Sequence, residues 1–233
     1  MIKNYLVIGA SSGIGEAIAL QLLGEGHQVF SASRNAPTIE GITHFTWDAN
    51  STDTSVLGQL PESIEGLVYC PGTINLKPIN RLSLDDFKTD FQINLIGAVA
   101  VIQAVLPKLK KANGASIVLF STVAAKIGMG FHASVAASKG AVEGLTKSLA
   151  AELSPVKIRV NCVAPSLTDT PLAKNLLSTE EKKEASNKRH PLGRVGTTED
   201  IARISTFLLN DSASWITGQI IGVDGGMGSI KGA

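Results

Sequence analysis

Cysteine is scarce in this 233-residue sequence, and most of the histidines are scattered. The two cysteines, Cys70 and Cys162, stand far apart and have neither metal-ligand spacing nor the pattern of a disulfide framework. His27, His44 and His190 also lack the spacing of zinc ligands. We therefore expect two free thiols in a reducing, cytoplasmic compartment, and we predict no metal site.

The sequence also lacks an excess of charge and a long hydrophobic run. Its 21 basic and 20 acidic residues are spread along the chain, which gives no basic patch for nucleic acid or an anionic membrane. The longest apolar run, residues 96–106, contains Gln103 and ends at Pro107, whereas a membrane span takes roughly 20 apolar residues. The segment MIKNYLVIGASSGIG has no signal-peptide core or cleavage site. We expect a cytoplasmic protein that binds a small molecule, with neither nucleic acid nor membrane as a partner.

Hydrophobic residues make up 44% of the chain and form short β-prone runs that alternate with stretches of helical spacing. The predicted strands cover residues 5–8, 28–32, 43–46, 66–69, 115–120, 157–163 and 219–223, and the predicted helices cover 14–23, 84–109, 135–153 and 199–209. This alternation predicts a single-domain Rossmann α/β fold over residues 1–233, with a doubly wound parallel sheet of about seven strands and helices on both faces. Residues 168–191 have no clear sheet role, so we interpret them as an irregular, mobile substrate lid.

Three glycines lie between the first predicted strand and the first predicted helix. Gly9, Gly13 and Gly15 form the pattern GxxxGxG. At such a junction, unpaired backbone N–H groups and the helix dipole favour a pyrophosphate. Because a strand precedes the glycines and a helix follows them, the pattern favours a dinucleotide site over a tight turn alone.

The end of the second predicted strand indicates which dinucleotide binds. An NAD site usually has an acidic residue there, but this chain has Ser33 and Arg34. A guanidinium matches the geometry of a 2′-phosphate, so we predict NADP(H), the alternative being that Arg34 is a solvated loop residue. Asp48, beyond the third predicted strand, is a candidate either to accept a hydrogen bond from the adenine amino group or to cap the next helix.

Several segments together resemble the short-chain dehydrogenase/reductase family, from Gly9 to Gly226. VIGASSGIG resembles its cofactor loop, FQINLIG its active-site asparagine segment with Asn94, and RVNCVAPSLTDTPL the segment beside the nicotinamide. PLGRVGTTEDIA and WITGQIIGVDGG resemble the C-terminal part of bacterial ketoacyl-reductase-like members. The resemblance implies carbonyl reduction or alcohol oxidation, and a homo-oligomer (dimer or tetramer) packed through the two long helices.

The resemblance also extends the set of residues expected to contact the cofactor. With those named above, the set is Gly9, Ser11, Ser12, Gly13, Ile14, Gly15, Ser33, Arg34, Asp48, Cys70, Pro71, Gly72, Asn94, Lys139, Pro165, Ser166, Thr168 and Thr170. Ser166 stands where the family usually has glycine, so its backbone is less free to adopt a positive φ.

The catalytic set departs from the family pattern. The resemblance implies a hydroxyl that holds the carbonyl oxygen, a tyrosine that moves the proton, and a lysine four residues later on the same helix face. Lys139 in SVAASK fits the lysine, but the tyrosine position is Val135, which cannot transfer a proton. Thr122, beside Ser121, fits the hydroxyl. His132 is a candidate replacement acid, the alternative being a loop histidine bonded to the backbone.

Two functions are compatible with this sequence. The first is an NADP(H)-dependent oxidoreductase for a small or acyl-carrier-bound carbonyl compound, which uses Asn94, Ser121 or Thr122, Lys139, and either His132 or a water in place of the tyrosine. The second is a non-catalytic NADP(H)-binding sensor, or the structural partner of an active paralogue. Val135 favours the second, because loss of a general acid slows a reaction by roughly 10²- to 10⁴-fold.

Overall fold

The computed structural model describes residues 1–230, which form one sheet of seven parallel strands. The strands are β1 (Asn4–Ile8), β2 (Gln28–Ser33), β3 (Ile42–Thr46), β4 (Gly66–Tyr69), β5 (Ala115–Phe120), β6 (Ile158–Pro165) and β7 (Ile220–Val223). Their order across the sheet is β3-β2-β1-β4-β5-β6-β7. The predicted doubly wound Rossmann fold is confirmed, and residues 231–233 of the predicted domain lie outside the described residues.

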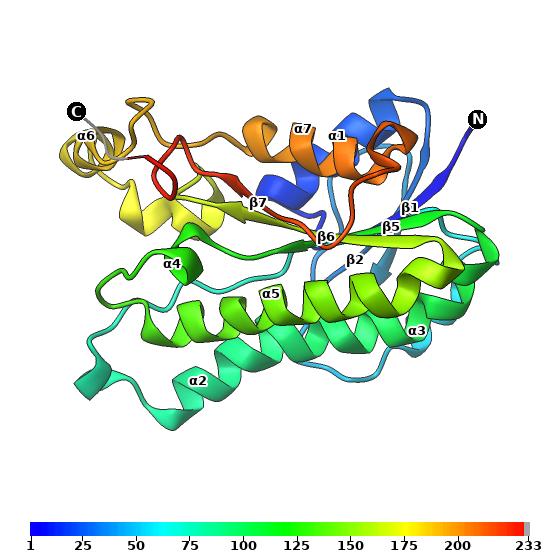
Figure 1. The fold of residues 1–233 in the computed structure, drawn as a ribbon, viewed down its shortest axis with the longest axis horizontal. Coiled ribbons are helices and arrows are strands. Elements are labelled where there is room, and N and C mark those ends of the chain that lie inside the picture. Colours follow the sequence, from blue (N-terminus) through cyan, green and yellow to red (C-terminus); the bar gives the residue numbers. More distant parts are fainter. Residues whose placement is uncertain (231–233) are drawn as a thin grey trace.

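Helices cover both faces of this sheet (Figure 1). On one face lie α1 (Gly13–Gly24) and α7 (Thr198–Leu209), and on the other lie α2 (Leu84–Phe91), α3 (Gly97–Lys111) and α5 (Ala133–Leu153). Every residue of β4 and β5 is buried, because strands covered on both faces become continuous apolar runs. Each face has its own hydrophobic core, with Ile18 and Ile201 in one and Val101 and Val142 in the other.

The long helix predicted over residues 84–109 is interrupted in the structure. A π-helical turn, Gln92–Ile96, separates α2 from α3, and the buried Asn94 lies within it. Such turns are rare and are frequently found at functional sites. By length and composition alone the stretch Leu84–Lys111 could cross a membrane, a property that it shares with core helices. Here Val101 and Val105 are fully buried in the core of one face, which accounts for its apolar composition.

The segment 168–191 is more regular than predicted. It contains a 3-10 turn (Pro171–Leu176) and the helix α6 (Glu180–Lys188), which begins at Thr179 because the Thr179 side chain accepts a hydrogen bond from the Lys182 amide. The prediction of an irregular stretch was therefore wrong, since the charged run from Glu180 to Glu184 lies in this helix. A second short helix, α4 (Val123–Lys126), was also missed.

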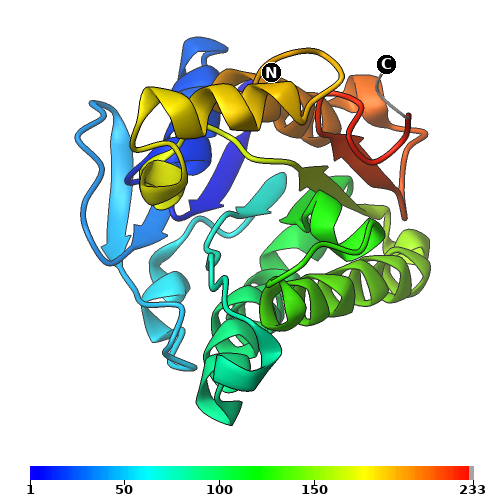
Figure 2. The ribbon, with the colours of Figure 1, turned by 90° about the vertical axis from the view of Figure 1, so that its left-hand side faces the viewer.

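The strand order reverses between β1 and β4, which lie side by side although β2 and β3 come between them in sequence. Ligands of open α/β sheets bind at such switch points, beyond the carboxyl ends of the strands. Figure 2 shows this edge, with the turn and helix of residues 168–191 crossing it in yellow. The fold therefore places the glycine loop, the ends of β4, β5 and β6, and the start of α5 around one region.

Candidate functional site

Glycine is required at the turn between β1 and α1. Gly9 and Gly13 have φ angles of +84° and +61°, which disfavour any residue with a side chain. A Cβ on Gly15 would collide with the Gly9 carbonyl oxygen, so α1 can pack this close to the loop only with glycine there. The turn thus leaves the start of α1 open, in the form that cradles a phosphate.

A groove begins at this turn, and we call it the cofactor groove. Residues 8–9, 11–15, 32–35, 47–50, 70–72, 93 and 170–172 line it. Of the predicted cofactor contacts, it includes Gly9, Ser11, Ser12, Gly13, Ile14, Gly15, Ser33, Arg34, Asp48, Cys70, Pro71, Gly72 and Thr170. Segments far apart in the sequence thus meet in one groove long enough to run from β2 to β4.

The groove end near β2 holds the residues predicted to select the cofactor. The Ser33 hydroxyl donates to the Asn35 carbonyl oxygen at 2.8 Å, which commits it to the loop, whereas Arg34 is exposed. Asp48 accepts hydrogen bonds from the backbone and side-chain nitrogens of Asn50 at 2.9 and 3.1 Å. Asp48 therefore closes a turn and caps no helix, which corrects one of the two readings of this residue; its contact with adenine remains a prediction.

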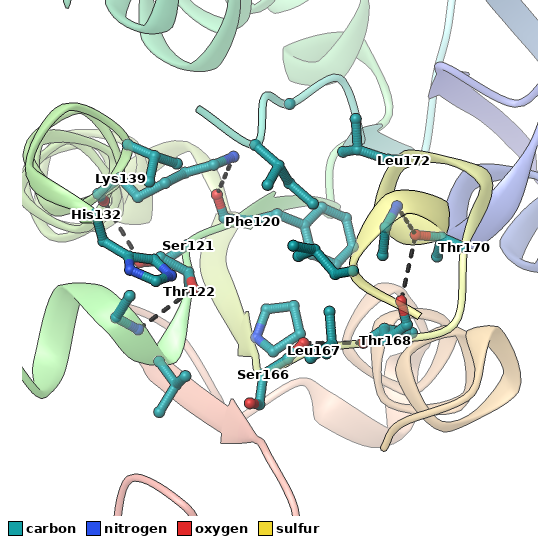
Figure 3. A pocket seen from close by; sticks show the side chains of 18 of the residues that line it. Phe120, Ser121, Thr122, His132, Lys139, Ser166, Leu167, Thr168, Thr170 and Leu172 are labelled. Atoms are coloured by element: carbon teal, nitrogen blue, oxygen red, sulfur yellow. Dashed lines mark hydrogen bonds between the residues drawn. The ribbon is translucent and has the colours of Figure 1, made fainter. Parts of the chain in front are cut away.

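A second space of about 290 Å³ adjoins the groove, and we call it the inner cavity (Figure 3). Residues 14, 70, 72–74, 76, 120–124, 129, 132, 135, 139, 165–168, 170, 172–173, 176, 189–190 and 227 line it. Its walls are mainly apolar, and Cys70 and Gly72 belong to both spaces. Four other predicted cofactor contacts line the inner cavity and not the cofactor groove: Lys139, Pro165, Ser166 and Thr168.

Lys139 comes from α5 and reaches the junction of the two spaces. Its Nζ donates to the Phe120 carbonyl oxygen at 2.9 Å, as Figure 3 shows, and the residue is only 7% exposed. A Cβ built on Gly72 would lie 3.5 Å from both Lys139 Nζ and Asn94 Oδ1, so both atoms face the same point of the backbone. Burial lowers the pKa of Lys139 to about 8, because the ammonium loses hydration.

Asn94 organises the elements around that junction. Its Nδ2 donates to Ser138 Oγ on α5 at 2.9 Å and to Thr73 Oγ1 at 3.0 Å. Its Oδ1 accepts from the Thr73 backbone at 3.2 Å. The π-turn thus places the buried Asn94 side-chain amide where its hydrogen bonds join α5 to the loop after β4. Asn94 itself is absent from both sets of lining residues.

The two hydroxyls after β5 have different partners. Ser121 Oγ donates to Glu143 Oε1 at 2.6 Å, so its proton is already used. Thr122 Oγ1 accepts from the Ala124 backbone at 3.3 Å, which starts α4 and leaves its proton for another acceptor. Both line the inner cavity, but only Thr122 keeps a donor available there.

His132 also lines the inner cavity, together with Val135 one turn before Lys139. The His132 Nδ1 lies 2.6 Å from the Gly130 carbonyl oxygen. A carbonyl only accepts, so Nδ1 carries a proton and neutral His132 turns an acceptor, Nε2, elsewhere. The bond to the backbone agrees with the interpretation of His132 as a loop histidine. Its position at the cavity is what a replacement acid would require.

Sequence reasoning missed His190, which is 4% exposed and lines the inner cavity. Its Nδ1 bonds the Ser186 carbonyl oxygen at 2.8 Å, and its Nε2 bonds Ser166 Oγ at 2.9 Å. The pair ties the end of α6 to the end of β6, and Ser166 does not have a positive φ. The one sequence signal near this contact was Ser166 itself, which departs from the glycine of the family pattern.

The chain is similar to known proteins over nearly its whole length. The family profile described as enoyl-(acyl carrier protein) reductase matches residues 9–228. The chain is 34% identical to the 3-oxoacyl-(acyl-carrier-protein) reductase FabG of Thermotoga maritima, over 97% of each chain. The ligand-free aldohexose dehydrogenase of Thermoplasma acidophilum has 30% identity and a TM-score of 0.91, over 100% of this chain and 97% of that one. A gluconate 5-dehydrogenase of Burkholderia cenocepacia, in complex with NADP and tartrate, has 26% identity and a TM-score of 0.91, over 98% and 96%.

Proposed function

Since the chain belongs to this family of short-chain dehydrogenases/reductases, we propose that it is an NADP(H)-dependent oxidoreductase that reduces a small or acyl-linked carbonyl compound without a catalytic tyrosine. The observation that carries the proposal is the position of Lys139, whose buried Nζ lies where the inner cavity meets the cofactor groove. An enzyme that must bring a dinucleotide and a carbonyl together needs polar groups at that junction.

The cofactor groove fits a dinucleotide. At its phosphate end, α1 packs so close to the glycine loop that only glycine fits at position 15, and its β2 end presents Arg34 with no carboxylate in the acidic position of NAD sites. Arg34 is exposed and therefore available for a 2′-phosphate. The similarity to a dehydrogenase solved with NADP is consistent with this assignment.

The residues of the chain divide the remaining work. Bound NADPH would supply the hydride. The Thr122 hydroxyl holds the carbonyl oxygen, because its proton is not used within the loop. Lys139 binds the ribose side of the junction, and Asn94 holds the Thr73 loop and α5 in register. Val135 fills the position of the family's tyrosine and is 6% exposed, so a group other than residue 135 must donate the proton.

A non-catalytic NADP(H)-binding protein is the second candidate, and Val135 is the observation that favours it. A buried valine in that position packs well without any acid, so selection for cofactor binding and assembly alone would be enough to keep this site. Such a protein would act as a sensor or as the structural partner of an active paralogue.

The test pairs binding with turnover. NADPH affinity is measured by fluorescence, and NADPH consumption is followed with a panel of ketones and 3-oxoacyl thioesters, for the parent and for Val135→Tyr and His132→Ala. We expect the parent to bind NADPH and to reduce at least one carbonyl. Tight binding with no reduction, and gain of reduction in Val135→Tyr, would show that the second candidate is correct.

We further propose that the protein works in the cytoplasm as a dimer or tetramer. The long helices α3 and α5 carry exposed side chains along the face that points away from the sheet, where a second copy would pack. Light scattering on the purified protein tests this, since a monomeric mass would refute it.

A further inference from the structure

The proposed function does not identify the group that protonates the carbonyl oxygen. An inference about this proton donor rests on the proposed function. We propose that Lys139 itself is the proton donor: its ammonium gives a proton to the substrate oxygen, directly or through one water, across the space that the short Val135 side chain leaves. The role assigned to a tyrosine by resemblance would thus pass to the residue one helix turn later.

The geometry places Lys139 for this step. The described residues accept only one hydrogen bond from its Nζ, at Phe120, although an ammonium has three N–H groups. Lys139 and Val135 both line the inner cavity, and Thr122 is on the same wall (Figure 3). Because valine is much smaller than tyrosine, the cavity extends along α5 toward the lysine, with no side chain of residue 135 long enough to stand between.

The other ionisable groups on the cavity wall are less suited. His132 uses its Nδ1 proton in the bond to the Gly130 carbonyl oxygen, so only Nε2 could give a proton to a substrate. Both ring nitrogens of His190 are engaged, by Ser186 and Ser166. Burial raises the pKa of the Cys70 thiol to about 12, which makes it a weaker acid than the ammonium. Arg189 does not lose its proton in proteins.

The proton balance of the step is simple. In reduction, the carbonyl carbon gains the hydride and the carbonyl oxygen gains a proton as an N–H bond of Lys139 breaks, which yields the alcohol, oxidised cofactor and a neutral amine. The amine then takes a proton from solvent. In alcohol oxidation the same amine accepts the hydroxyl proton. Lys139 therefore acts as acid in one direction and as base in the other.

The pH dependence follows from the surroundings of Lys139. Burial lowers its pKa to about 8, and the groups that oppose this shift are Cys162 on β6, Cys70 after β4 and Asp90 on α2. Below pH 8 the ammonium predominates, so reduction is fast there and falls tenfold per pH unit above it. Oxidation of the alcohol follows the opposite course and rises toward pH 8.

The experiment compares Lys139→Arg with the matched surface control Lys147→Arg, also on α5. Arginine keeps the positive charge beside the ribose but holds its proton. Three quantities are measured: the NADPH dissociation constant, the pH profile of carbonyl reduction, and the titration of lysine 13Cε signals by NMR, which needs no turnover. The signal that disappears in Lys139→Arg identifies Lys139.

We expect the Lys139 signal to titrate near pH 8. Lys139→Arg should lose at least 100-fold in reduction at saturating NADPH, together with the fall above pH 8, and Lys147→Arg should match the parent in both NADPH affinity and reduction. If Lys139→Arg reduces the carbonyl within threefold of the parent, or if His132→Ala abolishes the reaction and the pH profile, Lys139 is not the donor and the proposed function stands. If only Val135→Tyr is active, both proposals fail.

Discussion

At the scale of single residues, two positions determine the shape and the charge of the cofactor groove. Gly15 has no space for a side chain, and Arg34 provides the positive charge at the β2 end. Glycine at position 15 is a steric requirement of the fold, whereas Arg34 is expected to determine which dinucleotide binds. Changing each should therefore have a different consequence.

Gly15→Ala should destabilise the protein and impair cofactor binding together. The added methyl group must push α1 away from the Gly9 carbonyl oxygen, and such overpacking costs about 1–3 kcal/mol. Gly24→Ala, at the exposed end of the same helix and with open space around it, is the matched control. Thermal melts with and without NADPH measure both effects. Equal melting temperatures of the two variants would mean that α1 does not pack tightly against the Gly9 carbonyl oxygen.

Arg34→Glu should reverse the cofactor preference. A charge-assisted hydrogen bond contributes about 1.5–3 kcal/mol, so NADPH should bind at least tenfold more weakly, whereas NADH binding should be unchanged or stronger. Fluorescence titration with both cofactors makes the comparison, and Arg203→Glu, at an exposed position of α7 outside the groove, serves as the control. An unchanged ratio of the two affinities would place the 2′-phosphate elsewhere.

At the scale of secondary-structure elements, the sequence predicted the strands better than the segments that shape the cavity. Strand and helix patterns repeat over many residues, and the edges of β4 and β5 were predicted at their observed residues. The π-turn around Asn94 was not predicted, because a π-turn has the same apolar spacing as the helix on either side. Helix α6 was missed because it has almost no apolar face; only Ser186 of its residues is buried.

The sequence likewise predicted the parts of the site that come from local patterns but not the contacts between distant segments. The glycine loop and the helix pair of positions 135 and 139 are local patterns, so their residues do lie together. The bond between His190 and Ser166 joins residues 24 positions apart through a segment whose conformation the sequence did not reveal. No local pattern encodes such a contact.

His190→Ala should loosen the segment 168–191. The change removes the two hydrogen bonds by which the buried ring joins α6 to the end of β6, and each such bond contributes about 0.5–1.5 kcal/mol. The Ser166 hydroxyl keeps its bond to Met227 Sδ, and the Ser186 carbonyl oxygen keeps its bond from the Arg189 amide. Hydrogen exchange should become faster in α6 and stay the same in α1. His27→Ala is the control for loss of a partly buried histidine at the opposite end of the sheet. Unchanged exchange in α6 would show that this bond does not hold the segment.

At the scale of the whole molecule, the burial of one lysine makes stability depend on pH. The pKa of Lys139 falls from 10.5 to about 8 on folding, so between these values the unfolded chain binds more protons than the folded one. Stability should then rise from pH 8 to pH 10.5, by on the order of 3 kcal/mol from this group. Lys139→Met removes the contribution. Denaturant melts at several pH values test it, and the same slope in both proteins would mean that Lys139 is well hydrated.

The central claim is that this chain moves a hydride to a carbonyl carbon although residue 135 is valine. The most direct measurement is a single turnover of the parent protein with NADPH deuterated at the nicotinamide C4, followed by mass spectrometry of the alcohol. We predict that the alcohol gains one deuterium from the parent, and at least 100-fold more slowly from Lys139→Arg. An alcohol that forms only with Val135→Tyr would contradict the claim and leave a protein that binds the cofactor without using it.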